Sequence, residues 1–327
     1  MSAIKTIGVF TSGGDAPGMN ACIRAVTRRA LIGGFEVVGI RRGFVGMLES
    51  RFEKLDKNSV SNILQKGGTM LKSARSPEFR QKEGRAKAAH NLREAGIDAL
   101  VAIGGDGTLL GASLLAQEHG FAVVGCPGTI DNDLFGTDET IGFDSAINTA
   151  LESIDKIRDT ADAHERLFLI EVMGRDTGFI ALACGIGAGA ELILIPEQLD
   201  NPQAIKRRLK ELMPEQSRSS IVVVAEGDRF NGAGKIAEEL RNDSDFDDID
   251  LRVTVLGHVQ RGGAPTARDR ILATRLGVAA VEALLDNATN VMVGLVNNQI
   301  VRTPLDQVCS ERKEVDKSLL RLAEMVS

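Results

Sequence analysis

The chain has 327 residues, 43% of them hydrophobic and 26% charged, which is the balance of a folded globular protein and excludes a disordered one. A formal charge of -6 and the absence of Trp and Tyr argue against general nucleic-acid binding. No apolar run is long enough for a membrane span, and we expect no export signal and a cytoplasmic location. The cysteines lack C-x-x-C spacing and are interpreted as buried, reduced thiols; they are Cys22, Cys126, Cys184 and Cys309.

The first predicted unit is a strand, a glycine-rich turn and a helix. A β-rich run over 4–10 ends in SGGDAPGMN at 12–20, and helical spacing follows over 21–31. Because glycine lacks a Cβ, a turn that contains Gly14 lets the backbone approach an anion closely. Arg24 and Arg28 lie four residues apart on one face of this helix, a pattern that by itself is typical of a solvated surface.

A further strand over 35–40 is followed by a turn at 43–46 and by a polar loop with KGGT at 66–69 and SARSP at 73–77. Arg75 in this loop has two interpretations, a surface charge or a cation that reaches a bound phosphate. A predicted helix over 83–95 then leads to the most informative part of the chain.

An apolar run over 99–103 breaks on GGDGT at 104–108 and resumes as a helical pattern over 109–118, which predicts strand, tight turn and helix. Such a helix presents free N–H groups and the positive end of its dipole, so we expect this turn to hold phosphates. A carboxylate beside phosphates is repelled unless a cation lies between them. Asp106 is therefore interpreted as a Mg²⁺ ligand that faces a nucleotide.

The next strand, over 122–125, ends in CPGTIDND at 126–133 and brings Asp131 and Asp133 to the same predicted edge. The carboxyl edge of an open α/β sheet is where ligands bind. A single Asp in a glycine-rich loop often forms only an Asx-turn. Three acids at two adjacent strand ends instead favour phosphoryl transfer to an alcohol, which needs a carboxylate for the hydroxyl proton and acids for a metal.

The second half of the chain has a similar layout. A helix over 144–158 with one apolar face is the first predicted domain boundary. A strand over 166–172, the turn MGRDTG at 173–178 and an apolar helix follow, and strands alternate with helices over 191–241. We predict an α/β fold of two similar three-layer α/β/α (Rossmann-like) lobes with a cleft between them.

A strand over 251–256 runs into GHVQRGG at 257–263. A lone histidine is ordinarily structural, but His258 lies three residues from Arg261, and the pair is a candidate to bind a phosphoryl group. A helix over 266–285 and a strand over 291–296 are predicted next, and the rest is predicted to be a helical tail.

Several of these motifs together resemble the bacterial ATP-dependent 6-phosphofructokinases. GGDGT alone is also similar to the phosphate turn of NAD kinases and diacylglycerol kinases. The resemblance therefore depends on TIDND, MGR and GHVQRGG occurring with it, and it extends over nearly the whole chain. It implies transfer of the ATP γ-phosphoryl group to the 1-hydroxyl of fructose 6-phosphate. It also implies a nucleotide lobe at 1–142 plus 255–306 and a sugar-phosphate lobe at 143–254 plus 307–327.

The resemblance further implies roles for individual residues. Asp131 takes the proton of the sugar hydroxyl, and Asp133 assists the metal or orients Arg175. The residues that would hold ATP, with Asp106 on Mg²⁺, are Gly14, Arg75, Ser76, Gly105, Asp106, Gly107 and Thr108. The residues that would bind the sugar phosphate are Thr129, Ile130, Asp131, Arg166, Met173, Gly174, Arg175, Glu226, Arg252, His258 and Arg261. Arg166 and Arg252 would come from a neighbouring subunit of a homotetramer.

The family has a pyrophosphate-using branch with an acidic residue after GGD and a lysine before TIDND. Here those positions hold Gly107 and Gly128, which favours ATP, although a pyrophosphate-dependent enzyme remains the close alternative. The alternative of an NAD or lipid kinase would not account for the motifs MGR and GHVQRGG. A catalytically silent sensor of sugar phosphates or nucleotides would ordinarily have lost Asp106 or Asp131, and neither is lost.

The resemblance also implies an effector site for ADP or phosphoenolpyruvate. The matching residues are Arg24, Arg28, Lys57, Arg158 and Glu191. Two lysines expected near 215–217 are replaced by Glu215 and Ser217. Because an acid and a neutral group should bind an anion less well than two cations do, weak or altered allosteric control is expected.

Overall fold

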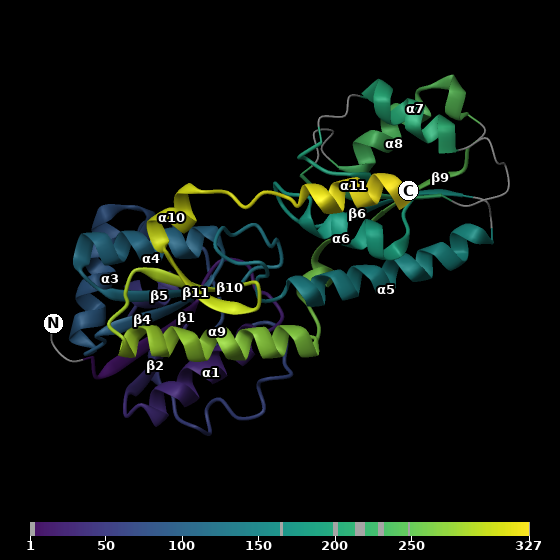
Figure 1. Ribbon diagram of the computed structural model, residues 1–327. Coiled ribbons are helices and arrows are strands. Elements are labelled where there is room, and N and C mark those ends of the chain that lie inside the picture. Colours follow the sequence, from purple (N-terminus) through teal and green to yellow (C-terminus); the bar gives the residue numbers. More distant parts are fainter. Residues whose placement is uncertain are drawn as a thin grey trace. The chain divides into compact units, whose positions relative to one another are not determined.

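The computed structural model describes residues 4–163, 166–198, 202–212, 220–227, 232–247 and 249–326. The chain forms two compact units, each assembled from separate segments (Figure 1). Unit 1 comprises Met1–Ile130, Leu134–Ser145 and Arg261–Lys313, and unit 2 comprises Asp131–Asp133, Ala146–Gln260 and Glu314–Ser327. Each unit is a sheet with helices packed on it, so the predicted α/β class is confirmed.

The sheet of unit 1 has the strand order β11-β10-β5-β4-β1-β2-β3. The strands from β10 to β2 are parallel, and β11 and β3 pair antiparallel at the two edges. β1 and β4 are buried at every position, which is why neither strand alternates between apolar and polar residues; only the terminal threonines of β1 are polar. The strands are β1 Thr6–Thr11, β2 Glu36–Ile40, β3 Phe52–Lys54, β4 Ala99–Gly104, β5 Ala122–Pro127, β10 Val291–Val296 and β11 Gln299–Pro304.

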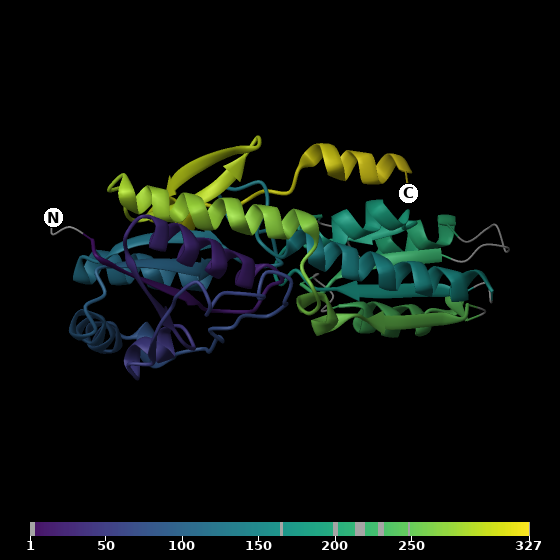
Figure 2. The same ribbon diagram turned by 90° about the horizontal axis from the view of Figure 1, so that it is seen from below.

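Helices cover both faces of this sheet. α1 (Met19–Ile32) packs along α9 (Ala267–Leu285), and the two lie side by side in both views (Figure 2). The other face carries α3 (Lys82–Glu94) and α4 (Asp106–His119), together with two short helices and a 3₁₀ turn. These are α2 Phe44–Leu48, α10 Leu305–Ser310 and η1 Glu78–Arg80.

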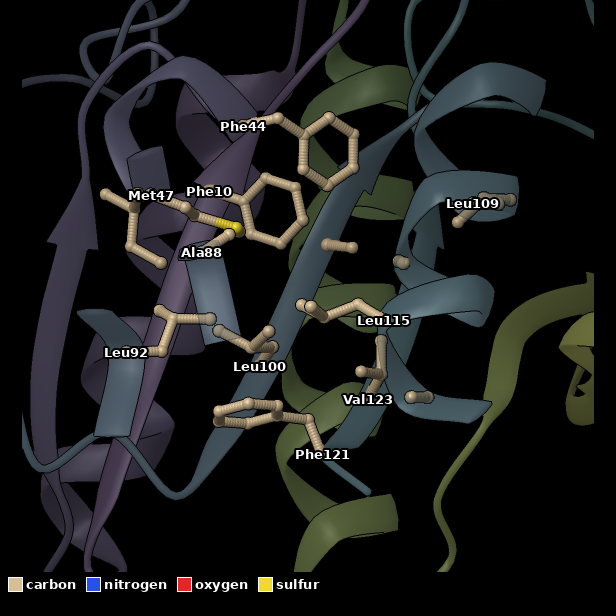
Figure 3. Close-up of a cluster of buried hydrophobic side chains, with 14 of the residues drawn as sticks. Phe10, Phe44, Met47, Ala88, Leu92, Leu100, Leu109, Leu115, Phe121 and Val123 are labelled. Carbon is tan, nitrogen blue, oxygen red and sulfur yellow. The ribbon is translucent and has the colours of Figure 1, made fainter. Parts of the chain in front are cut away.

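The core beneath α3 and α4 is built from the apolar faces of those helices and of the central strands (Figure 3). Phe44 stacks on Phe79 with ring centroids 3.9 Å apart, and Phe10 of β1 lies 5.2 Å from Phe44. A Cβ at Gly111 of α4 would lie 2.7 Å from Cζ of Phe44, so glycine is needed for this approach. The aromatic cluster thereby fixes α4 on the sheet.

Unit 2 has a smaller, fully parallel sheet in the order β7-β8-β6-β9. Side chains of α7 and α8 pack on one face, and α6 packs on the sheet from the other side and also contacts α11. α5 begins in unit 1 and continues into unit 2 at Ala146. The elements are α5 Phe143–Asp162, β6 Leu167–Val172, α6 Phe179–Ala188, β7 Leu192–Leu194, α7 Pro202–Leu212, β8 Ser220–Ala225, α8 Ala233–Arg241, η2 Ser244–Phe246, β9 Leu251–Val255, η3 Gly257–Arg261 and α11 Lys317–Val326.

Three sequence predictions are wrong in detail. The stretch after 296 is not only a helical tail, because β11 forms a hairpin with β10 around Asn297 and Asn298, both at positive φ. The turn predicted at 43–46 is the start of α2. Cys309 is exposed, whereas the other three cysteines are buried as expected.

Candidate active site

Three parallel strands of unit 1 end at one edge of the sheet, and the glycine turns follow them. Thr11 at the end of β1 lies beside Ile103 of β4, and Gly104 lies beside Pro127 at the end of β5. The turns after β4 and β5 are joined directly, because Gly128 N donates a hydrogen bond of 3.0 Å to Gly104 O. The segments that the sequence assigns to substrates therefore start next to one another.

The turn at 104–108 leads straight into α4, which begins at Asp106 and has no side-chain N-cap. A Cβ at Gly104 would lie 2.4 Å from Oγ1 of Thr108, whereas one at Gly107 would meet nothing within 4 Å. Thr108 Oγ1 is buried and has no hydrogen-bond partner among the described residues. An oxyanion at this helix N-terminus would satisfy the hydroxyl and accept from backbone N–H groups.

Gly14, in the turn after β1, lies against a cation. A Cβ there would be 2.6 Å from Nη1 of Arg261, and that nitrogen donates to Asp15 O at 3.3 Å. The family resemblance assigns Gly14 to ATP and Arg261 to the sugar phosphate, and the structure brings the two together within unit 1. His258, one of the three other residues assigned to that phosphate, is exposed and belongs to unit 2.

The loop that carries Arg75 is attached to the glycine turn after β1. The hydroxyl of Ser73 donates to the carbonyl of Gly13. Ser76 Oγ accepts from Phe79 N at 3.3 Å, which holds the first turn of η1. The Arg75 side chain is exposed. Arg75 is therefore presented from an anchored loop, while the hydroxyl of Ser76 already serves the local fold.

The segment after β5 carries a buried carboxylate. Thr129 and Asp131 are 7% and 1% exposed, and a Cβ at Gly105 would lie 3.3 Å from Cβ of Thr129. Arg175 Nη2 lies 3.8 Å from Asp131 Oδ2 within unit 2, and the Arg175 side chain is about half exposed. A buried carboxylate of this kind can accept a proton while the neighbouring cation stabilises negative charge, as phosphoryl transfer requires.

The acidic residues do not form a cage for a metal. Among the described residues, no group of three or more His, Cys, Asp or Glu side chains could hold an ion. Asp106 is exposed at the start of α4, and Asp133 is half-buried. Mg²⁺ keeps several waters and is usually held by one or two carboxylates plus substrate phosphates. A single carboxylate beside a phosphate-binding turn fits that mode.

In unit 2, the turn after β6 is held by two side chains. Glu226 Oε1 accepts from Gly174 N at 3.3 Å and from Arg175 N at 2.8 Å. Gln260 is fully buried, and its Oε1 accepts from Met173 N at 3.4 Å. Arg175 has a φ of 55°, a strained conformation that these contacts maintain. Gln260 was not singled out from the sequence, although it lies inside the GHVQRGG motif.

Arg166 and Arg252 are brought together by a shared acid. Asp250 accepts from Arg166 Nε at 2.6 Å, and Arg252 Nε lies 2.8 Å from its other oxygen. The hydrogen bond from Arg166, followed by that from Arg252, lowers the pKa of Asp250. The family resemblance implies that both arginines bind a phosphate, whereas Asp250 was not singled out from the sequence. The alternation of acid and arginine at 250–252 was the available signal.

The residues assigned to an effector site fall in both units. In unit 1, Arg24 and Arg28 are half-buried, and burial together with the Arg28 charge lowers the pKa of Arg24. Arg28 Nε is buried without a hydrogen-bond partner among the described residues. Such a pair of cations would gain from a bound anion. Lys57 is exposed in the same unit.

In unit 2, Arg158 and Glu191 contact each other. Arg158 Nη1 lies 3.3 Å from Glu191 Oε1, and Glu191 Oε2 accepts from Ile221 N at 2.7 Å. Glu191 also lines a cavity of about 220 Å³ together with Arg208 of α7 and Leu320 of α11. Residues 215 and 217 lie outside the described residues.

Comparisons with known proteins agree with these motifs. The phosphofructokinase family model matches residues 6–284. The ATP-dependent 6-phosphofructokinase 1 of Thermus thermophilus is 56% identical over 324 residues, which cover 99% of this chain and 100% of that protein. The chain belongs to the phosphofructokinase family, which confirms the resemblance read from its motifs.

Solved structures give the same family. The phosphofructokinase of Saccharomyces cerevisiae has a TM-score of 0.86 and 38% identity, and the match covers 98% of this chain but only 46% of that one. A pyrophosphate-dependent phosphofructokinase from Marinobacter aquaeolei has a TM-score of 0.82 and 25% identity, over 96% of this chain and 86% of that one. Within the described residues, no helix is both long and apolar enough to span a bilayer.

Proposed function

We propose that the chain is an ATP-dependent 6-phosphofructokinase, which transfers the γ-phosphoryl group of ATP to the 1-hydroxyl of D-fructose 6-phosphate and forms fructose 1,6-bisphosphate and ADP. The observation that carries this proposal is the bond of 3.0 Å between Gly128 N and Gly104 O. It joins a turn suited to phosphates to the segment that bears the buried Asp131. Donor and base are then supplied from adjacent strand ends, as a direct transfer requires.

ATP is held by the glycine turns and the loop beside them. Backbone N–H groups at the start of α4 and the Thr108 hydroxyl bind phosphate oxygens, and the exposed guanidinium of Arg75 stabilises charge on the transferred group. Asp106 binds Mg²⁺, which when present neutralises part of the phosphate charge. The full set is Gly14, Arg75, Ser76, Gly105, Asp106, Gly107 and Thr108.

Asp131 accepts the proton of the sugar 1-hydroxyl as that oxygen attacks phosphorus. Its burial restricts the carboxylate to one position, and a positioned base of this kind contributes ~10²–10⁴-fold to the rate. Arg175, 3.8 Å from the carboxylate, stabilises negative charge at the transfer point. Asp133 orients Arg175 or assists the metal.

The sugar phosphate is bound mainly by unit 2. Glu226 accepts hydroxyl groups of the sugar, while the segment at 129–131 and the turn at 173–175 line the transfer point. The 6-phosphate is bound by His258, Arg261, Arg166 and Arg252. We further propose that Arg166 and Arg252 act on the site of a neighbouring subunit in a homotetramer. Their shared contact with Asp250, which holds the two guanidinium groups together, supports a joint role.

Two glycines favour ATP over pyrophosphate as the donor. A Cβ at Gly107 would meet nothing of the protein within 4 Å, so a side chain there would extend into the space that the nucleotide needs. A Cβ at Gly128 would lie 3.1 Å from Ile103 Cγ2 and 3.3 Å from Gly104 N, so a lysine would require the strand ends to shift. The names of the full-length relatives point the same way.

The division of labour between lobes is also proposed. We assign nucleotide binding to 1–142 plus 255–306, sugar-phosphate binding to 143–254 plus 307–327, and a cytoplasmic location to the enzyme. The half-buried pair Arg24 and Arg28 supports an anionic effector. With Arg158, Glu191 and Lys57 it would form an effector site that binds weakly.

A coupled assay with fructose 6-phosphate tests the proposal, run once with MgATP and once with Mg²⁺ and pyrophosphate. Turnover with MgATP alone is expected, and Asp131→Ser should lower kcat by ~10²–10⁴-fold. Glu152→Gln, on an exposed pair with Lys156 in α5, is the matched control and should not change kcat. Turnover with pyrophosphate alone would replace the ATP assignment. If neither donor supports turnover, a catalytically silent sensor of sugar phosphates or nucleotides would describe the chain better.

A further inference from the structure

Asp269, in the first turn of α9, is a buried carboxylate to which the substrate assignments give no role. It is 1% exposed, and burial raises its pKa. Gly142 N donates to Oδ1 at 2.8 Å, and Ser145 donates to Oδ2 twice, from N at 2.8 Å and from Oγ at 2.6 Å. A buried carboxylate is costly unless its hydrogen bonds are complete, so this one marks a specific connection rather than ordinary core packing.

The residues bound by Asp269 close the loop that carries the proposed base. Thr140 Oγ1 donates to Thr129 O at 2.6 Å, and Ile141 N donates to Pro127 O at 2.9 Å. Residues 140–141, where the loop returns, are thus bonded to residues 127–129 at the end of β5. The next residue, Gly142, is bonded to Asp269. The segment at 129–131 is therefore tied to α9 through one short chain of hydrogen bonds.

The start of α9 is fixed to the same place from its own side. Thr266 caps α9, its N donates to Ser145 Oγ at 2.9 Å, and its hydroxyl donates to Asp144 Oδ2 at 2.5 Å. Arg261, which lies against Gly14, precedes this cap by five residues. The first turn of α9 therefore connects the loop of Arg261 to the loop that carries the proposed base.

The same contacts hold the first turn of α5. This helix starts at Phe143 in unit 1 and passes into unit 2 at Ala146, immediately after Ser145. Asp269 thus fixes two features at once. These are Gly142, where the loop that begins at Gly128 returns, and the first turn of α5.

We propose that Asp269 is a positioning residue for phosphoryl transfer, which acts through Gly142 and Ser145 and does not touch the substrates. This inference rests on the proposed function. Asp269 keeps the 129–131 segment and the start of α5 in the one arrangement that serves the acceptor sugar. The turn at 104–108 is also held by α4 and the central sheet, so we expect it to depend on Asp269 much less.

Asp269→Asn is the test, because the two side chains are nearly the same size. The amide oxygen can still accept from Ser145, but the amide nitrogen would face the N–H of Gly142, so one contact becomes a clash of two donors. We expect kcat to fall about ten- to a hundredfold and KM for fructose 6-phosphate to rise, while KM for MgATP stays within about twofold. Ser145→Ala should give the same pattern more weakly.

Asp286→Asn is the control, since Asp286 follows the last turn of α9 and pairs with Arg302 at the surface. It should match the wild type in all three parameters. The proposal would be overturned if Asp269→Asn had the wild-type KM for each substrate and its kcat fell only in proportion to the fraction of folded protein. Asp269 would then be a structural residue.

Hydrogen exchange of the free protein gives a second readout that needs no turnover. Asp269→Asn should speed exchange of the amides at 128–145 about tenfold and leave those at 104–108 unchanged. Unchanged exchange at 128–145 would contradict the proposal. Because this measurement is independent of the reaction, it remains decisive even if the chain does not phosphorylate fructose 6-phosphate.

Discussion

A Cβ placed on Gly67 would lie 2.1 Å from the carbonyl oxygen of Gly263, so the two backbones are in direct contact. The loop of Gly67 continues to Arg75, and Gly263 follows Arg261. The neighbouring Asn20 fixes the same loop, because its Nδ2 donates to the carbonyls of Lys66 and Gly67 and its Oδ1 accepts from Met70 N at 2.7 Å. The loops proposed for ATP and for the sugar phosphate are thus held against each other within unit 1.

Gly67→Ala should force these loops apart. We expect it to lower the free energy of unfolding by about 1–3 kcal/mol, because a methyl group would overlap backbone that cannot rotate away. Gly234→Ala in α8 is the control, since a Cβ there would meet nothing within 4 Å, and it should stabilise by about 0.5–1 kcal/mol. Urea unfolding of both variants measures the difference. A Gly67→Ala variant as stable as the wild type would show that the contact is dispensable.

A buried ion pair and an exposed one on the same helix should differ strongly in their effect. Arg85 forms two hydrogen bonds with Glu118, at 2.6 and 2.8 Å, and also donates to Arg80 O. Arg85→Met should destabilise by about 3 kcal/mol because it leaves Glu118 without its cation. Lys87→Met breaks only the surface pair with Glu78 and should cost under about 1 kcal/mol. Equal losses of unfolding free energy in the two variants would contradict the prediction that the buried pair contributes more.

The same pair should make stability depend on pH. The hydrogen bond from Arg85 lowers the pKa of Glu118 below its ordinary 4.5. Glu118 therefore contributes stability that is present above the unfolded-state pKa and is lost as pH falls through the lower folded-state pKa. The difference in unfolding free energy between wild type and Arg85→Met should shrink as pH is lowered from 6 to 3, as measured by urea titration. A constant difference over that range would be inconsistent with the pair.

Only one cysteine should react with a thiol reagent in the native protein. Cys309 is exposed, whereas Cys22, Cys126 and Cys184 are buried, and burial raises the pKa of Cys184 to about 12. We expect one equivalent of Ellman's reagent to react natively and four after denaturation in guanidinium. Partial desolvation of the Cys309 sulfur, together with the negative charges of Asp106 and Asp306, raises its pKa even though the residue is exposed, so its reaction should be slow near neutral pH. Cys309→Ser should abolish the native reaction, and residual reactivity would show that a buried thiol becomes accessible.

Allosteric inhibition should be weak. The chain has Glu215 and Ser217 where the family resemblance leads us to expect lysines, so the effector site should bind phosphoenolpyruvate poorly. Titration of phosphoenolpyruvate against activity at a low concentration of fructose 6-phosphate measures this. The double variant Glu215→Lys, Ser217→Lys should increase the inhibition. Strong inhibition of the wild type at sub-millimolar effector would contradict the prediction.

Much of the fold could be predicted because its strands and turns have local sequence patterns. Buried parallel strands are continuous apolar runs, and glycine turns follow β1, β4 and β5, so the sequence was sufficient for the α/β class and for the segments that meet at the sheet edge. Family motifs then supplied the reaction, which a spacing of acids and glycines alone would have left open among several kinases.

Other features depend on contacts between distant residues. Asp269 accepts hydrogen bonds from residues more than a hundred positions away. The role of Asp250 is visible only from its contacts with Arg166 and Arg252. The edge strand β11 alternates polar and apolar residues weakly, and the paired asparagines at its start were the only local sign of a hairpin. A local pattern, such as the one at 250–252, can mark a residue but does not identify a partner that is distant in the sequence.

The segmented construction of unit 1 bears on how the chain folds as it is made. β5 pairs with β4 on one side and with β10 on the other, yet β10 ends only at Val296, after nearly all of unit 2 has been synthesised. While the ribosome translates unit 2, one side of β5 therefore has no neighbouring strand, and an unpaired strand edge invites aggregation. Truncated products that end before 291 should be the species that need a chaperone, and the amino-terminal segment should not fold stably by itself.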